Sequence, residues 1–250
     1  MANRKHYAFQ QMVAAGYSDD HSHNHKFGAA PAISINTTSS IWDVQGLYPW
    51  TALDTPAVVN VERNNAADNG MVVTVQGLDE NWDYQTENIT ITGADQVGTK
   101  LWRRVNRAYV TGAAQQYNTG DIDIEAGAAG GTTVARITAN LGQTLMAVYT
   151  IPRGYIGYLY QGTMTIQEGG DGTGYMFIRR NGEGVTFRVA HTFEVGNSAY
   201  NYKFSFPPAI PEKSDIDVRA FVRANNSRVT ATFDILLVEN DPEAPITDLL

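Results

Sequence analysis

The stretch RVTATFDILLVE, residues 228–239, carries the pattern that decides the fold. Its apolar side chains recur at every second position and would share one face of a strand: Val229, Ala231, Phe233, Ile235 and Leu237. The opposite face carries mostly polar side chains, as in a strand with one side on a core and the other in water. This alternation is typical of antiparallel sheets.

Similar period-two segments recur along the chain, separated by turn-rich spacers such as RNNAADNG and EGGDGTG. They cover residues 32–38, 57–62, 71–76, 87–93, 100–110, 121–126 and 132–138, and a second series follows residue 140. No long helical pattern lies between them. We therefore predict an all-β chain with two antiparallel domains resembling β-sandwiches or jelly rolls.

The pattern also suggests where the domains begin and end. The tripeptide LGQ after Asn140 interrupts the series of strands. We expect an extended N-terminal arm at residues 1–29, a first β domain at 30–140, a second at 141–240 and a C-terminal tail at 241–250.

Composition limits the possible partners. The 250 residues carry a formal net charge of -8, which disfavours nucleic acid as a partner because DNA and RNA attract Lys and Arg. No apolar run approaches the ~20 residues of a membrane span, and the first residues lack the apolar region of a signal peptide. We expect no membrane partner and folding in the cytoplasm. The absence of cysteine excludes disulfides and thiolate chemistry.

The sequence offers no assembled set of catalytic residues. It contains no G-x-S-x-G motif, and His191 is the only histidine outside the first 25 residues, in the middle of a predicted strand. Asp121, Asp123 and Glu125 alternate in DIDIEAG and could face a cation, but calcium sites usually use bent loops, so we favour a solvated face. We expect no enzyme activity, cofactor or metal.

Two clusters are candidates for protein contacts. Trp102, Arg103, Arg104 and Arg107 form either a basic patch that docks on an acidic neighbour or a sheet edge protected by charge. The alternate aromatic residues of YNYKFSF form either a core-facing strand or an interface: Tyr200, Tyr202, Phe204 and Phe206.

The N-terminal segment DDHSHNHKF places His21, His23 and His25 at every second position. In an extended chain all three would face one way, so a metal shared between chains and a mobile polar leader are both alternatives. We favour an arm that orders against a neighbouring subunit, with Tyr7, Phe9 and Met12 as apolar anchors. Deletion of residues 1–26 is then expected to leave the β body folded.

Several phrases of the chain resemble virion structural proteins of tailed bacteriophages. They are SSIWDVQGLYPWT (39–51), VTVQGLDENWDYQTENITITG (73–93), LWRRVNRAYV (101–110), LMAVYTIPRGYIGYL (145–159) and FPPAIPEKSDIDVRA (206–220). The likeness extends over most of residues 33–240 and carries no catalytic signature.

This resemblance implies a non-enzymatic, β-rich virion component, specifically a capsid decoration or cement protein that stabilises contacts between capsid subunits. It further implies contacts with other virion proteins such as the major capsid protein. We expect a homo-oligomer, with a trimer as the favoured state, because virion parts sit on symmetry axes. The alternative is a tail or fibre module that binds carbohydrate on the host surface.

Overall fold

The structure is a computed structural model and describes residues 8–112, 117–167, 170–182, 184, 186–196 and 199–240. Its regular elements are strands, apart from one short helix, α1 (Phe9–Ala14), and two 3-10 helices, η1 (Trp50–Leu53) and η2 (Ala66–Asp68). The paired strands run antiparallel throughout the described residues, which confirms the all-β, antiparallel prediction. None of the described helices is long and apolar enough to span a membrane.

Sheet A contains the stretch that first indicated the fold. Its strand order is β1-β17-β11-β14, with β15 beside one end of β11. The strands are β1 (His21–Ile33), β11 (Tyr155–Ile166), β14 (Tyr200–Lys203), β15 (Ala209–Ile210) and β17 (Ser227–Glu239). The five alternate apolar side chains of β17 are all buried, as its pattern predicts.

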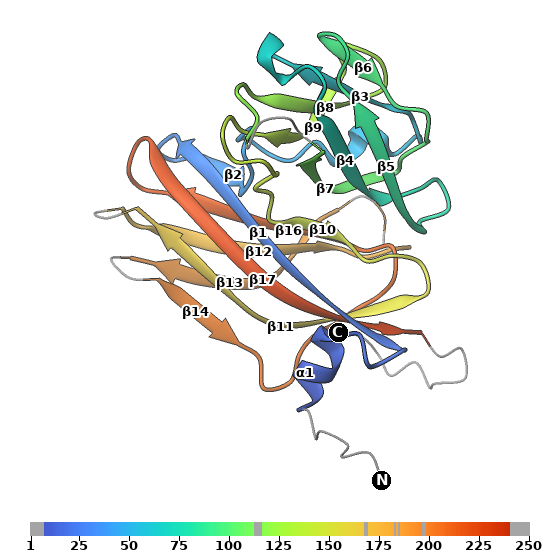
Figure 1. Cartoon of the computed structure of the whole chain (residues 1–250). Helices are drawn as coiled ribbons and strands as arrows, with labels where there is room; N and C mark the ends of the chain where they lie inside the picture. Colours follow the sequence, from blue (N-terminus) through green and yellow to red (C-terminus); the bar gives the residue numbers. More distant parts are fainter. Residues whose placement is uncertain are drawn as a thin grey trace.

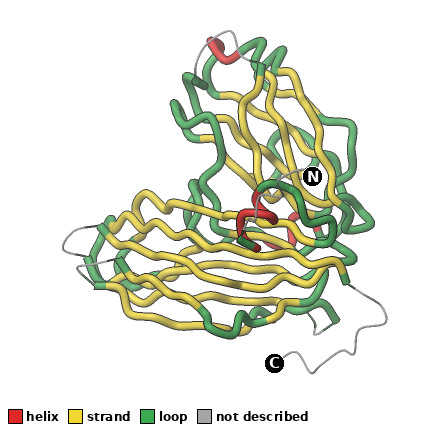
Figure 2. Tube along the Cα trace, turned by 60° about the horizontal axis from the view of Figure 1, so that its bottom comes forward, coloured by secondary structure: helices red, strands yellow, loops and turns green. Residues whose placement is uncertain are grey.

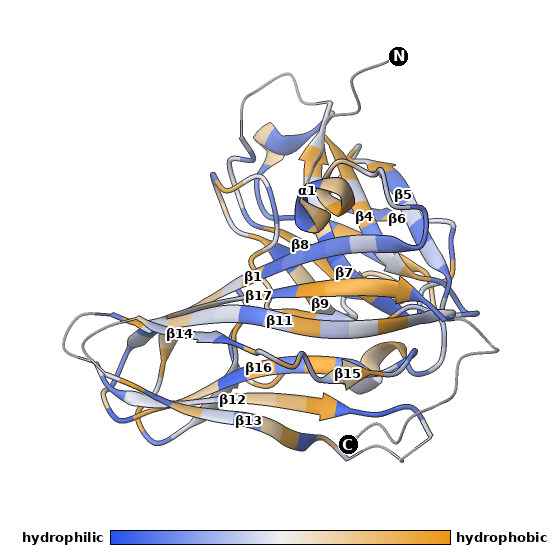
Figure 3. Cartoon of the chain, turned by 90° about the horizontal axis from the view of Figure 1, so that it is seen from below, coloured by the Kyte–Doolittle hydropathy of each residue, from blue (hydrophilic) through white to orange (hydrophobic). Residues whose placement is uncertain are grey.

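Sheet B lies against sheet A as a second layer, which Figure 3 shows nearly edge-on. Its order is β10-β16-β12-β13, and β2 also pairs with β16. The strands are β2 (Thr38–Ser40), β10 (Val148–Thr150), β12 (Gly172–Arg179), β13 (Arg188–Val195) and β16 (Asp215–Val222). The side chains between the two layers form one hydrophobic core, and we call this part the A/B unit.

Two smaller sheets form the rest of the molecule, the C/D unit. Sheet C has the order β6-β3-β8-β9 and sheet D the order β5-β4-β7. Their strands are β3 (Val59–Arg63), β4 (Val72–Leu78), β5 (Tyr84–Thr90), β6 (Asp95–Val97), β7 (Arg104–Thr111), β8 (Ile122–Ala126) and β9 (Thr132–Ile137). A second hydrophobic core fills this unit, and Figures 1 and 2 show the two groups of strands at an angle to each other.

The C/D unit is inserted into the A/B unit. The chain changes cores between Ile41 and Trp42, and it changes back where Met146 and Val148 face one core while Ala147 and Tyr149 face the other. The expected domain at residues 30–140 therefore differs from the structure, since Ala30 belongs to the A/B core. The order of strands along the sequence could not reveal the insertion. Strand β2 precedes the inserted unit and β10 follows it, yet both belong to sheet B.

The expected arm at residues 1–29 also differs from the structure. Residues 21–33 form β1, a long edge strand that pairs with β17 of the same chain, with His25 opposite Asp234. In Figure 1 this blue strand lies beside the red one. Because deletion of residues 1–26 would remove the partners of residues 233–238, it would damage sheet A rather than leave the body intact.

One glycine allows β1 to pass close to the junction of the units. A Cβ atom on Gly28 would lie 2.3 Å from both the Ala147 nitrogen and the Ile41 oxygen. Both are backbone atoms at the points where the chain crosses between the cores, so they cannot move aside as a side chain could. Glycine is required there for close approach, not for an unusual backbone angle.

Candidate functional site

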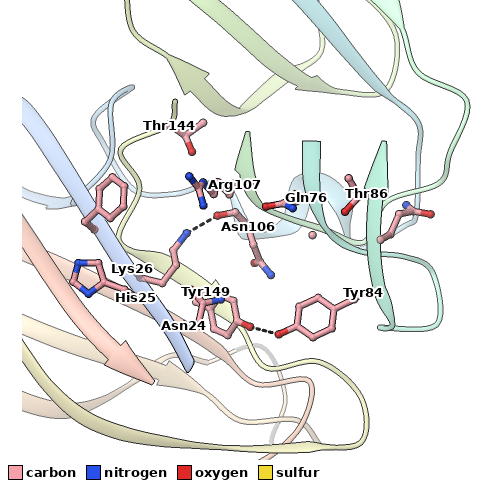
Figure 4. A pocket seen from close by; sticks show the side chains of 13 residues that line it. Asn24, His25, Lys26, Gln76, Tyr84, Thr86, Asn106, Arg107, Thr144 and Tyr149 are labelled. Carbon is pink, nitrogen blue, oxygen red and sulfur yellow. Dashed lines mark hydrogen bonds between the residues drawn. The ribbon is translucent and has the colours of Figure 1, made fainter. Parts of the chain in front are cut away.

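A cavity of about 220 Å³ lies between the two units. Strand β1 forms one wall, sheet D forms the other, and Tyr149 of β10 closes the floor (Figure 4). The lining residues are Asn24, His25, Lys26, Phe27, Gln76, Gly77, Tyr84, Gln85, Thr86, Asn106, Arg107, Thr144 and Tyr149. They come from segments far apart in the sequence, so only the docking of the units creates this site.

Lys26 is the main charged group of the cavity. It alternates with His25 on β1, so its side chain points to the opposite side of the strand, toward sheet D. The side chain is buried, and its Nζ donates a hydrogen bond of 2.5 Å to the backbone oxygen of Asn106. Burial, followed by the charge of Arg107, lowers the pKa of Lys26 from 10.5 to about 7.

Asn106 brings an unused hydrogen-bond donor to the same cavity. Its residue is 7% exposed, and its buried Nδ2 has no hydrogen-bond partner. Figure 4 shows the amide pointing toward Tyr149 and Tyr84. An unpaired buried amide costs free energy, and this one lies beside an open space where a polar group could approach after a small adjustment.

Two tyrosines, Tyr149 at the floor of the cavity and Tyr84 at its rim, join the units. The hydroxyls of Tyr84 on β5 and Tyr149 on β10 are hydrogen-bonded at 2.7 Å (Figure 4). Burial raises the pKa of Tyr84 to about 12 and holds the pKa of Tyr149 well above its usual value. Both hydroxyls therefore stay protonated at neutral pH, and each can donate as well as accept a hydrogen bond.

The charged residues that line the cavity are basic, whereas the chain as a whole is acidic. The lining contains Lys26, Arg107 and His25 but no aspartate or glutamate, although the chain carries a formal net charge of -8. The lining therefore offers hydrogen-bond donors and cations without a carboxylate to neutralise them. Its chemistry suits binding of an anionic or strongly polar group.

The three N-terminal histidines lie on the outer side of β1, away from the cavity interior except at its rim. His23 Nε2 and His25 Nδ1 approach the same Asp234 oxygen, at 3.0 and 2.6 Å. His21 pairs with Ser18 and packs edge-on against Phe9. Within the described residues no group of three or more metal-ligating side chains is arranged to hold a metal ion.

The carboxylate of Asp234 is the centre of that outer cluster. Burial acts to raise its pKa, but hydrogen bonds from Gln161, His25 and His23 outweigh burial and lower it. The histidine contacts expected with a neighbouring subunit are therefore made within this chain, across the β1–β17 pair. The local sequence could not indicate this partner, since Asp234 lies more than 200 residues from both histidines.

The other proposed anchors of the arm also contact this chain where they are described. Phe9 belongs to α1, which packs on β1, and this residue is 40% exposed. Met12 is half-buried in the same helix. Tyr7 and the tail at residues 241–250 lie outside the described residues.

The basic cluster at residues 102–107 is divided between core, junction and surface. Trp102 is 0% exposed in the C/D core, so it cannot form an interface with another folded chain. Arg104 is buried in an ion pair, whereas Arg103 packs over Trp82 and bonds the Asp54 backbone oxygen. Arg107 is exposed and bonds Gln143. The four side chains therefore do not form one exposed basic patch, because successive residues of a strand point to opposite faces of the sheet.

The aromatic strand is mainly part of the A/B core. Tyr202 is buried, Tyr200 and Phe204 pack against the core, and Phe206 alone is 92% exposed. His191 packs against the rings of Phe193, Tyr202 and Phe204 in tilted or edge-on contacts, and burial lowers its pKa. The core-facing alternative therefore describes this segment, apart from Phe206.

The acidic alternation at residues 121–125 is also occupied by protein partners. Asp123 forms a two-bond ion pair with Arg136, at 2.6 Å for each bond. Glu125 accepts hydrogen bonds from Asn60 and from the backbone nitrogen of Gly130. These contacts compete with a cation for the same oxygens.

Sequence reasoning missed the buried ion pairs that join the units. Arg104 of sheet D donates to both oxygens of Asp215 on β16, at 3.0 and 3.3 Å. Arg179 of β12 also bonds Asp215, and Thr150 donates to it at 2.5 Å. We call this group the Asp215 cluster.

Asp217 extends the same junction along β16. It accepts hydrogen bonds from Trp50 at 2.9 Å and from Ser40 at 3.1 Å, and it pairs with Arg219. Burial raises the pKa of Asp217 despite these partners. The spacing Asp-x-Asp-x-Arg in DIDVRA was a possible signal, because charges on one face of a buried strand need partners across it.

Comparisons with known proteins leave the family open. No family model matches this chain, and no curated protein matches it. Among solved structures, it is similar to the structure of infectious bursal disease virus Gx strain, with 10% sequence identity over 90% of this chain and 74% of that one. The TM-score of 0.22 does not establish a shared fold or function.

Proposed function

We propose that this chain is a non-enzymatic structural component of a tailed-phage particle, acting as a capsid decoration or cement protein. One observation carries the proposal: the phrases that resemble phage virion proteins supply most of the junction between the units. Arg104 and Asn106 come from residues 101–110, Tyr149 from 145–159, and Asp215 and Asp217 from 206–220. The resemblance thus falls on the residues that lock two β units together.

A locked junction suits a mechanical role. Buried ion pairs whose partners lie on different units resist relative motion, because separation would leave charges without water or partners. Enzymes with active sites between units usually need such motion, whereas the ion pairs here oppose it. A rigid two-unit body can bridge neighbouring capsid subunits without deforming.

We further propose that each pair of sheets is a β-sandwich of the jelly-roll kind. The separate core of each pair supports this interpretation, since sheets arranged as blades around one axis would not divide into two filled cores. An experimental structure of the purified protein tests it, and a common central channel among all four sheets would contradict it.

Contacts with the particle would use surface that the fold leaves uncovered. Strands β13 and β14 end their sheets, and exposed Val189 and Phe206 lie on or near them. Free strand edges and exposed aromatic rings are common elements of stable interfaces. In this proposal they contact the major capsid protein or another copy of the chain, with a trimer as the favoured assembly.

Cryo-electron microscopy of the intact particle is the direct test. Density for the two-unit body at the junctions of capsid subunits, in many copies, is the expected result. In parallel, particles that lack the protein should lose integrity at lower temperature, and purified protein should restore it. Density at the tail tip only, with no effect on the head, would contradict the decoration role.

The second candidate is a tail or fibre module that binds carbohydrate. Tyr84, 53% exposed at the rim of a cavity lined by amide side chains, is the observation that favours it, because sugars bind through stacking and multiple hydrogen bonds. The position in the particle separates the two candidates.

A further inference from the structure

We propose that the cavity between the units is a binding site for a small hydroxylated molecule that carries one carboxylate, of about the size of an acidic monosaccharide. The inference is independent of whether the chain lies on the head or the tail. It rests on the positive charges of Lys26 and Arg107 without a carboxylate beside them, on the unpaired amide donor of Asn106 and on the size of the cavity.

The first argument is charge. Lys26 and Arg107 line the cavity together, and the lining contains no carboxylate to neutralise them. Elsewhere in the protein, buried cations have such partners: Arg104 and Arg179 both pair with Asp215. A buried lysine without an acid is costly in its charged form, as the lowered pKa of Lys26 reflects, and an anion from outside would stabilise that form.

The second argument is hydrogen bonding. The cavity contains a buried amide nitrogen with no partner, at Asn106, and two tyrosine hydroxyls that remain protonated. Gln76, Thr144 and Asn24 add further polar groups around it. This set can satisfy the hydroxyls and the carboxylate oxygens of one small ligand at the same time.

The third argument concerns size and access. A cavity of about 220 Å³ is smaller than the ~300–1,000 Å³ of drug-sized sites and suits a single sugar ring rather than a polymer. Its rim is open to solvent, because Tyr84, His25 and Arg107 are exposed. A ligand could therefore enter without separation of the units.

The number of charges decides between acid types. At neutral pH Arg107 is fully charged, whereas Lys26, with a pKa of about 7, is protonated in only part of the molecules. Because Arg107 is exposed, water screens much of its charge, so a ligand with one negative charge fits this pair better than a phosphate monoester, which brings nearly two. The other titratable groups that line the cavity are Arg107, Tyr84, Tyr149 and, at the rim, His25.

Calorimetric titration at pH 7 tests the proposal, with glucuronate as the probe and glucose and glucose 6-phosphate as comparisons. We expect glucuronate to bind at millimolar or lower concentration, with glucose at least about tenfold weaker. The carboxylate favours the protonated form of Lys26, so binding should take up protons. Titrations in two buffers of different ionisation enthalpy measure this proton uptake.

Two variants locate the binding in this cavity. Lys26→Met and Arg107→Gln should each weaken glucuronate binding at least about tenfold, whereas Lys203→Met, at an exposed lysine on the outer side of sheet A, should leave it unchanged. Arg107 is exposed, so its variant remains informative if Lys26→Met does not fold.

Three results would overturn the assignment. They are no binding of glucuronate up to about 10 mM, unchanged binding by both variants in folded form, or tighter binding of glucose or glucose 6-phosphate than of glucuronate.

Discussion

The junction between the two units has two parts with opposite electrostatic properties. In the Asp215 cluster, each buried charge faces an opposite charge, and the carboxylate accepts bonds from Arg104, Arg179 and Thr150. In the cavity, Lys26 bonds a backbone oxygen, and Asn106 has a donor with no partner among the described residues. The first part is complete without a ligand, while the second has room and unmatched charge. We therefore interpret the Asp215 cluster as a structural contact and the cavity as a candidate binding site, although both lie on the same interface.

The largest effect should come from Asp215. Asp215→Asn would leave Arg104 and Arg179 buried without their shared counter-charge, and the free energy of unfolding should fall by about 3–5 kcal/mol. Chemical denaturation measures it. Asp83→Asn is a matched control, because Asp83 also pairs with an arginine of the other unit, Arg153, but in an exposed position. Its expected cost is about 0–1 kcal/mol, and similar losses in both variants would contradict the comparison.

The next effect should depend on pH. Lys26 has a pKa of about 7 in the folded protein and 10.5 in the unfolded chain, so the unfolded state binds more protons between these values. The contribution of Lys26 to stability must therefore rise as pH increases from about 7 to about 10, by an amount on the order of a few kcal/mol. We expect the unfolding free energy of the natural protein, minus that of Lys26→Met, to increase across this window.

The pH window distinguishes Lys26 from other titrating groups. The subtraction cancels groups that both proteins share. Lys203→Met provides the control, since its exposed ammonium should give a nearly flat difference. A flat difference for Lys26→Met as well would mean that Lys26 is charged and satisfied in the folded state.

A smaller effect is expected at Gly77, which lies between the two parts of the junction. A Cβ there would stand 2.0 Å from the backbone oxygen of Arg104, across the irregular β4–β7 pair. Gly77→Ala should push the strands apart and cost about 1–3 kcal/mol. Thermal unfolding measures the loss, and glucuronate affinity shows whether the cavity changes with it. Gly112→Ala would not be a suitable control, because Gly112 has a positive φ of its own.

The smallest effect should follow Tyr84→Phe. The substitution removes the hydroxyl that bonds Tyr149 at 2.7 Å and leaves a buried tyrosine with one partner fewer. We expect a loss of about 0.5–1.5 kcal/mol, measured by chemical denaturation. Tyr117→Phe, at an exposed tyrosine in the C/D unit, should change stability by less. Equal effects would mean that the Tyr84–Tyr149 bond does not help hold the units together.

The sequence by itself determined the class of fold and much of the core. Alternation in residues 228–239 placed five buried side chains correctly, and YNYKFSF offered the core-facing alternative that Tyr200, Tyr202 and Phe204 adopt. These features are local, because the side-chain period of a strand depends only on backbone geometry. No distant residue is needed to recognise them.

Only the tertiary structure decided the units and the site. Residues 21–26 looked like part of an arm because their side chains are polar on both sides, yet one side faces Asp234 and the other faces sheet D. The pairing of β1 with β17 joins segments about 200 residues apart, and no local pattern encodes which strands will meet. The cavity and the Asp215 cluster share that dependence, since each needs side chains from both units. Their chemistry arises from burial against a partner surface, which a sequence pattern cannot supply.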